Sequence, residues 1–158
     1  MTYTADFGAV SATFHPGAEG EQAATGPGTI SRFVAPGSVT RGRFGLFEFR
    51  MAAGAGRADP HFHRTFSESF YILSGTMRLY DGDRWVEALE GDFLHVPEGG
   101  VHAFHNESGA AAAMLILFAP GAPREAYFRE LADISSSGRV LSDEEWTDLF
   151  ARHDQYRA

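Results

Sequence analysis

The sequence of 158 residues contains no cysteine and no lysine. Without cysteine the chain has no thiolate metal ligands, no disulfides and no cysteine nucleophile, although this absence leaves the cellular compartment open. All 13 basic residues are arginines, so Schiff-base chemistry and a lysine general base are excluded. Two common kinds of covalent catalysis are therefore unavailable to this protein.

Positive charge and long apolar runs are also scarce. Acidic residues number 21 against 13 basic ones, and the formal charge of −8 argues against nucleic acid or an anionic membrane surface as partner. A small-molecule substrate is the partner that we expect. No window approaches a membrane span, and the N-terminal residues lack the basic and apolar segments of a signal peptide. We therefore expect a cytoplasmic protein with one domain.

Three histidines and one glutamate stand out by their spacing. His61 and His63 are two residues apart, so on an extended strand both side chains project to the same face. Glu68 reaches that face only if the chain bends over residues 64–67, and we expect this bend. With His102 these residues supply three imidazoles and a carboxylate, which is a ligand set for one divalent transition metal (Fe, Ni, Mn, Cu or Zn). The alternative is a core or surface position without metal, which would bury a polar quartet at a cost on the order of several kcal/mol.

The same residues belong to two motifs that are separated by residues 76–90. The motifs read His61-x-His63-x4-Glu68-x6-Gly75 and Gly91-x5-Pro97-x-Gly99-x2-His102-x3-Asn106. On these motifs the chain resembles the cupin superfamily over residues 42–120. One position departs from the pattern, because the leading glycine of the first motif falls on Ala55, between two other glycines. This departure concerns the local turn and leaves the four ligands in place.

The resemblance implies an all-β fold with a single cupin (jelly-roll) barrel and a short C-terminal helical extension. We expect an N-terminal arm over residues 1–28, the barrel over 29–120, and C-terminal helices packed on the barrel over 121–158. Cupins that keep this ligand set include quercetinase-type dioxygenases, oxalate oxidase, polyketide cyclases and sugar-phosphate isomerases. Small cupins commonly pair through their barrel strands, so the resemblance also implies a homodimer.

Local patterns predict the elements around the motifs. Residues 29–34 and 43–51 are typical of strands, and an Asp-Gly-Asp turn joins strands 77–80 and 85–89 into a hairpin. The apolar run 110–118 favours a strand buried on both faces.

After Pro123 the apolar period becomes helical, and a capping box from Ser142 to Glu145 begins a second helix. We expect both helices on the outside of the barrel.

Aromatic residues in the motifs are candidates for a substrate pocket. Phe70, Phe93 and Phe104 could form the wall of an aromatic-binding cavity, and His95 shares a strand face with Phe93 and could line it too. The alternative is that these phenylalanines are ordinary core residues. His105 lies three residues after His102 and should therefore face the other way.

The ligand set limits the chemistry. Three neutral imidazoles and one carboxylate leave a divalent ion with a net charge of about +1 and, in octahedral geometry, about two positions for exchangeable ligands. Glu68 is the one ligand that could also accept a proton, so it is the candidate catalytic residue. The leading hypothesis is an oxygenase or dioxygenase of a small aromatic or enolic substrate. The alternatives are a redox-neutral zinc-dependent cyclase or isomerase, and a non-catalytic small-molecule-binding cupin.

Overall fold

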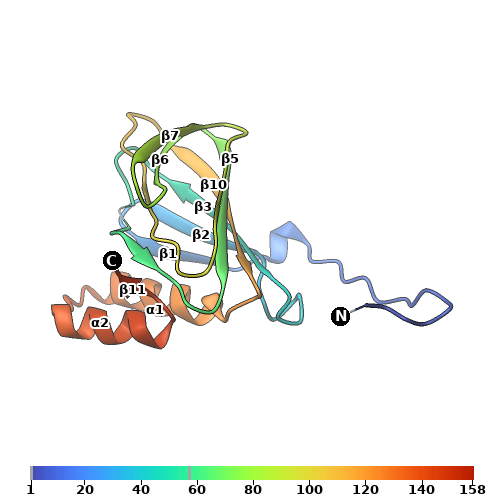
Figure 1. Cartoon of the computed structure of the whole chain (residues 1–158). Coiled ribbons are helices and arrows are strands. Elements are labelled where there is room, and N and C mark those ends of the chain that lie inside the picture. The colour runs from blue at the N-terminus through green and yellow to red at the C-terminus, as the bar shows by residue number, and fades with distance from the viewer. Residues whose placement is uncertain (1, 57) are drawn as a thin grey trace.

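Antiparallel strands dominate the computed structural model, which describes residues 2–56 and 58–158 (Figure 1). The strands that precede the first motif are β1 Gln22–Gly26, β2 Thr29–Ala35 and β3 Gly45–Met51. The motif region holds β4 His61–Phe62, β5 Ser67–Ser74, β6 Thr76–Tyr80, β7 Trp85–Leu89, β8 Phe93–Val96 and β9 Ala103–His105. After it come β10 Ala112–Ala119, helices α1 Arg124–Ser137 and α2 Asp143–Arg152, and β11 Tyr156–Arg157, while a 3-10 turn, η1 Gly17–Glu19, precedes β1.

Two sheets enclose the core. The larger one has six strands in the order β1-β2-β3-β10-β5-β8, and the smaller one has the order β7-β6-β9. All registered pairs are antiparallel, and β4 pairs with β11 at the end of the chain. This mainly β architecture with a short helical C-terminal part confirms the predicted fold class.

The inner face of the large sheet follows the alternation in the sequence. In β3, Phe47, Phe49 and Met51 are buried in the core, while Glu48 between them pairs with Arg32. Strand β10 differs from our expectation, because its residues alternate between buried and half-buried positions instead of being buried on both faces. A uniformly apolar strand hides which face is covered, because both faces have the same composition.

The sheet begins earlier than the expected boundary at residue 29. Strand β1 pairs with β2 and is joined to it by a tight turn, although its Gln-Ala-Ala-Thr-Gly sequence has little strand propensity. Residues 2–15 extend away from the barrel (Figure 1), with Phe7 and Phe14 more than four fifths exposed.

The two helices cover one open end of the barrel (Figure 1). Helix α2 begins with the predicted capping box, in which the Ser142 hydroxyl accepts from the Glu145 N–H and the Glu145 carboxylate accepts from the Ser142 N–H. Helix α1 packs on the end of the barrel, and its side chains reach further inward than its apolar stripe alone indicates. The ring centroid of its Phe128 lies 4.9 Å from that of Phe47 and 5.3 Å from that of Phe49, and both of these rings face inward. An open barrel end exposes the inner face of the sheet, and the apolar stripe of α1 buries that face.

Aromatic side chains remain on the outer face of the large sheet. Tyr71 and Phe93 are cross-strand neighbours there, 43% and 64% exposed. Such a face suits pairing with a second copy, and the homodimer stays a prediction. Among the described residues, no helix combines the length and apolar character that a membrane span requires.

Candidate metal centre

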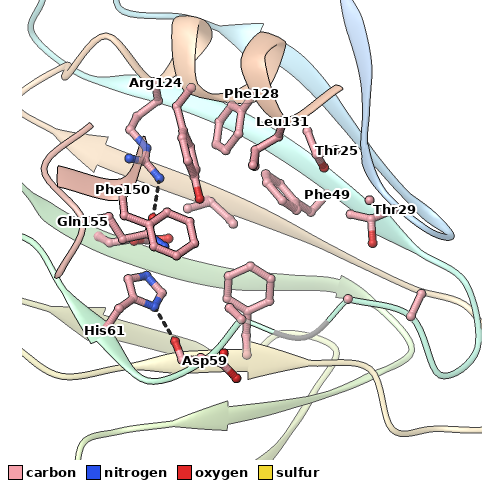
Figure 2. A pocket seen from close by; sticks show the side chains of 18 of the residues that line it. Thr25, Thr29, Phe49, Asp59, His61, Arg124, Phe128, Leu131, Phe150 and Gln155 are labelled. Atoms are coloured by element: carbon pink, nitrogen blue, oxygen red, sulfur yellow. Dashed lines mark hydrogen bonds between the residues drawn. The ribbon is translucent and has the colours of Figure 1, made fainter. Parts of the chain in front are cut away.

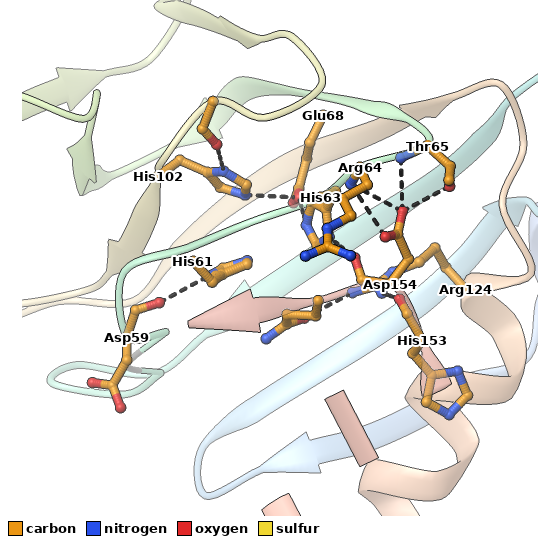
Figure 3. A network of polar contacts seen from close by, with 12 residues as sticks. Asp59, His61, His63, Arg64, Thr65, Glu68, His102, Arg124, His153 and Asp154 are labelled. Atoms are coloured by element: carbon orange, nitrogen blue, oxygen red, sulfur yellow. Dashed lines mark hydrogen bonds and ion pairs between the residues drawn. The ribbon is translucent and has the colours of Figure 1, made fainter. Parts of the chain in front are cut away.

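The four predicted ligands come together inside the barrel (Figure 3). His61 lies in β4, His63 directly after it, Glu68 in β5, and His102 directly before β9. One potential ligand atom from each lies within 4.8 Å of the other three, and all four residues are buried. The backbones of His61 and His102 form an antiparallel bridge, in which each N–H donates to the carbonyl of the other residue, with N to O distances of 3.0 and 2.9 Å. This bridge fixes the two motifs against each other.

The expected bend brings Glu68 to the face of the histidines. The chain bends at Arg64 and Thr65, between β4 and β5. The carboxylate of Asp154, from the C-terminal tail, accepts hydrogen bonds from the Thr65 N–H and hydroxyl at 2.8 and 2.7 Å and from the Arg64 N–H at 3.1 Å. These bonds outweigh the effect of burial, which alone would raise the pKa of Asp154, and they lower that pKa overall. The tail therefore holds the bend.

Each imidazole is oriented by a backbone carbonyl. Nδ1 of His61 lies 2.7 Å from the Asp59 carbonyl oxygen, Nδ1 of His63 lies 2.6 Å from that of Asp154, and Nδ1 of His102 lies 3.0 Å from that of Gly100. Because a carbonyl only accepts, all three Nδ1 atoms carry the hydrogen. Nε2 of His63 and Nε2 of His102 point at Glu68 Oε2, each at 2.9 Å. A bound metal ion would take the place of these hydrogen bonds, with Nε2 as the ligand atom of each histidine and Nδ1 held by its carbonyl, which is the usual arrangement of histidine ligands.

Burial and mutual charge set the protonation of the cluster. Burial, reinforced by His102, lowers the pKa of His61 to about 3, so this imidazole is neutral. Burial raises the pKa of Glu68, but the charges and hydrogen bonds of His102 and His63 outweigh it and hold that pKa well below its usual value. Burial lowers the pKa of His102, and the Glu68 carboxylate 2.9 Å away raises it more, so the net shift is upward.

This donor set fits a divalent metal ion. Glu68 Oε2 lies 2.9 Å from Nε2 of both His63 and His102, so imidazole nitrogens and a carboxylate oxygen surround one point. An ion there would compensate the negative charge of a carboxylate that is otherwise fully enclosed. His61, His63, Glu68 and His102 could hold the ion, and nothing in the geometry selects one transition metal over another.

Other motif residues shape the backbone around the cluster. Gly75 has a φ of +74°, and a Cβ atom at this position would lie 2.7 Å from the Ala111 carbonyl oxygen, so only glycine fits. The buried amide of Asn106 donates to the carbonyls of Met51, Ala52 and Ala110 at 2.8 to 3.2 Å. Asn106 thereby joins the end of β3 to the loop before β10.

A cavity of about 570 Å³ opens next to the cluster (Figure 2). His61 and Glu68 line it from the metal side. Its apolar wall is contributed by both the barrel and the helices: Phe49, Phe104, Ile116, Phe128, Trp146 and Phe150. The volume and the aromatic wall suit a small organic ligand beside the metal position.

Two of the expected pocket residues lie elsewhere. Phe93 is 64% exposed and His95 is exposed on the outer face, where it hydrogen-bonds Ser69, so neither lines the cavity. In the register of β8 against β5, Val96 pairs with Glu68 and Leu94 pairs with Phe70, and these residues take the inward face instead. Strand parity correctly grouped Phe93 with His95, but it could not show which face is inside.

The other two expected pocket residues are inside the barrel. Phe104 lines the cavity, and its ring centroid lies 6.0 Å from that of Phe49. Phe70 is fully buried behind the cluster, with its ring 5.8 Å from that of His102. His105 lies outside the cluster, stacked on Trp85 at 4.5 Å.

The C-terminal tail supplies site residues that the motifs do not indicate. Arg124 and Gln155 line the cavity, and the Asp154 carbonyl orients His63. The tail is held by the β4–β11 pairing and by a hydrogen bond from the Ala158 N–H to the Pro60 carbonyl. Asp154 has a φ of +53°, a conformation in which aspartate is tolerated, but the sequence gives no signal of its contact across about ninety residues.

Replacing Asp154 with glycine is expected to lower zinc affinity by about 10- to 100-fold, which is the usual cost of losing support behind a metal ligand. Glycine accepts the positive φ but removes the carboxylate that holds the tail to the bend, so the carbonyl that orients His63 is no longer fixed. Competition with a chromogenic chelator measures the affinity.

Arg152→Ala is the matched control for this variant. It removes an exposed ion pair with Glu130 at 2.7 Å in the same C-terminal region, without touching the bend, and should bind zinc as the wild type does. A folded Asp154→Gly protein with wild-type affinity would show that the tail does not support the site.

Comparisons with known proteins agree with this geometry. A sequence model described as a cupin domain matches residues 47–118. The chain is 33% identical over 115 residues to quercetin 2,3-dioxygenase of Bacillus subtilis (strain 168), covering 73% of this chain and 33% of that protein. The chain thus spans a third to a half of the length of the sequence relatives that it matches.

Solved structures show the same fold. The polyketide cyclase RemF from Streptomyces resistomycificus has a TM-score of 0.58 and 25% identity, over 69% of this chain and 80% of that one. A sugar phosphate isomerase of the cupin superfamily from Silicibacter pomeroyi has a TM-score of 0.54 and 25% identity, over 61% and 62% of the two chains.

Proposed function

The chain is a member of the cupin superfamily, and from this premise we propose that it is a metal-dependent oxygenase of a small aromatic or enolic molecule. The observation that carries the proposal is that His61 and Glu68 belong both to the metal-ligand cluster and to the wall of an aromatic cavity. A substrate in the cavity would therefore contact the metal position directly. The similarity to quercetin 2,3-dioxygenase supports an oxygen-using reaction.

A divalent metal would supply a Lewis acid for a substrate oxygen and, if redox-active, a means for dioxygen to react. When both atoms of dioxygen enter a substrate whose carbon–carbon bond is cleaved, the substrate supplies all four electrons and no external reductant is needed. The protein then has to bind and orient the substrate, exclude water, and take up the proton of the substrate hydroxyl.

Glu68 is the group placed to accept that proton. Its carboxylate is 3% exposed and lines the cavity, and hydrogen bonds to His63 and His102 fix one of its oxygens. The low pKa of Glu68 keeps it ionised. Because such a carboxylate is a weak base, the transfer requires a substrate hydroxyl whose own pKa a bound metal would lower. The aromatic rings of Phe49, Phe104 and Phe150 would pack on a planar substrate and keep water away from the reacting oxygen.

A redox-neutral cyclisation or isomerisation is the second candidate. The resemblance to a polyketide cyclase and to a sugar phosphate isomerase, each at 25% identity, favours it. With zinc in the same ligands, Glu68 would move a proton between two positions of an enolisable substrate.

Metal analysis and oxygen consumption distinguish the candidates. We expect the purified protein to carry Fe, Ni, Mn or Cu, and to consume oxygen in an electrode assay with at least one class among catechols, flavonols and acyclic enediols. The control is the same protein after chelation, which should consume none. Zinc without oxygen uptake, together with turnover of an enolisable substrate, would replace the oxygenase by the cyclase or isomerase. Zinc without any turnover would favour a non-catalytic binding protein.

A further inference from the structure

Arg124 is a buried cation in the wall of the cavity. It is 4% exposed, and no carboxylate of the described residues forms a salt bridge with it. Figure 2 shows its side chain extending from the start of α1 toward the side of the cavity where His61 lies. A guanidinium in this environment needs compensation, because burying a charge without a partner is costly.

The neighbours of Arg124 compensate its charge only in part. Nη1 donates to the His153 carbonyl at 3.0 Å and Nη2 donates to the Gln155 side-chain oxygen at 3.3 Å, and both acceptors are neutral. Nε is buried and has no acceptor among the described residues. The guanidinium carbon lies 4.1 Å from the ring centroid of Tyr127, and the carboxylates of Glu68 and Asp154 attract the charge without forming a salt bridge. A guanidinium has five N–H donors, and some of them therefore remain unused.

The charges around the cavity leave it positive once a divalent ion is bound. Among the described residues that line it, Glu68 and Asp59 are acidic and Arg124 and Arg157 are basic. Glu68 is also one of the candidate metal ligands, so its negative charge would neutralise one of the two positive charges of the ion. An anionic ligand would balance the excess that remains.

We propose that the substrate of this cavity is a small aromatic carboxylate, whose carboxylate group is bound by Arg124 while its ring packs against the phenylalanine wall. The planar guanidinium suits a carboxylate better than a phosphate here, because a phosphate dianion usually requires several cations. Of the two described arginines that line the cavity, Arg124 is buried and Arg157 is exposed. The inference rests on the proposed function, since it takes the cavity to be the substrate site.

Binding to the zinc-loaded protein tests this proposal without turnover. The probes are benzoate, 2-hydroxybenzoate and 1-naphthoate, each paired with its neutral amide, and calorimetry gives the dissociation constants. We expect at least one acid to bind about tenfold tighter than its amide, and this preference to fall at high salt. Equal affinities for acids and amides, or no acid bound at millimolar concentration, would overturn the proposal.

Variants assign the preference to Arg124. Arg124→Gln should remove it and Arg124→Lys should retain part of it, because lysine keeps the charge but not the planar fork. Arg129→Gln is the matched control. It makes the same change on the same helix, but at a 55% exposed side chain that pairs with Glu21 outside the cavity, and should leave the preference intact. A folded Arg124→Gln protein that keeps the acid preference would overturn the role of Arg124.

If Arg124→Gln does not fold, as circular dichroism would show, the acid-to-amide comparison in the wild type still decides whether the ligand is anionic. The outcome is also separable from that of the oxygenase reaction. Acid preference without oxygen uptake would overturn the reaction alone. Oxygen uptake with neutral catechols and no acid preference would overturn the anionic substrate alone.

Discussion

Replacing His63 with alanine should lower zinc affinity by at least about 100-fold, because it removes a ligand rather than the support behind one. The imidazole is 2% exposed, its Nε2 faces Glu68, and the Asp154 carbonyl fixes its orientation, so no neighbouring group can take its place. The barrel should still fold, because most of its stability comes from apolar burial in the two sheets. Chelator competition and elemental analysis measure the loss, and circular dichroism reports the fold.

His105→Ala is the control for this result. It makes the same substitution three residues after a ligand, but His105 stacks on Trp85 and approaches Glu107 at 3.1 Å outside the cluster. Zinc content should stay at the wild-type level. If His63→Ala keeps stoichiometric metal, the ligand set is wrong. If it unfolds while His105→Ala folds, the metal is structural.

Replacing Glu68 with glutamine should lower the turnover of the substrate found in the oxygen-uptake screen by a factor on the order of 100 or more. Glutamine has nearly the same size and keeps a possible ligand oxygen, so the protein should retain substantial metal. It cannot accept a proton, and the negative charge that Glu68 contributes next to His102 is lost. Rates normalised to metal content separate the chemistry from weaker binding.

Glu48→Gln provides the matched carboxylate control. Glu48 is also buried, but it lies on the opposite face of β3 from the cavity wall and pairs with Arg32 and Arg50. Its replacement should affect stability and leave the normalised rate unchanged. Full turnover by a metal-loaded Glu68→Gln protein would reduce Glu68 to a replaceable ligand. His95 could not then serve as the base, because it lies on the outer face.

Local spacing relates His61, His63 and Glu68 to one another, whereas His102 is assigned to the same site through the second motif of the cupin pattern. The pairing of His61 with His63 follows from strand parity, and the position of Glu68 follows from one bend, which the structure contains at Arg64 and Thr65. The capping box of α2 likewise depends on four consecutive residues, 142–145, and can be predicted from them alone. Features of this kind need no knowledge of distant contacts.

Tertiary contacts decide the features that the sequence does not predict. Parity divides β8 into two faces, but only its pairing with β5 places Leu94 and Val96 inside and Phe93 outside. The placement of Phe128 among inward-facing rings depends on the open barrel end that α1 covers. Arg124 is a candidate binding group because α1 and the C-terminal tail pack against the barrel and place it in the cavity wall, and the sequence does not indicate this packing.

The most direct test of the account is anomalous diffraction from crystals of the protein grown with zinc or manganese. We expect one strong peak per chain among Nε2 of His61, His63 and His102 and the Glu68 carboxylate, at about 2.0 to 2.3 Å from each ligand atom. A peak at another position, or no peak in metal-saturated crystals, would contradict the claim that these four residues form the centre of the protein's chemistry.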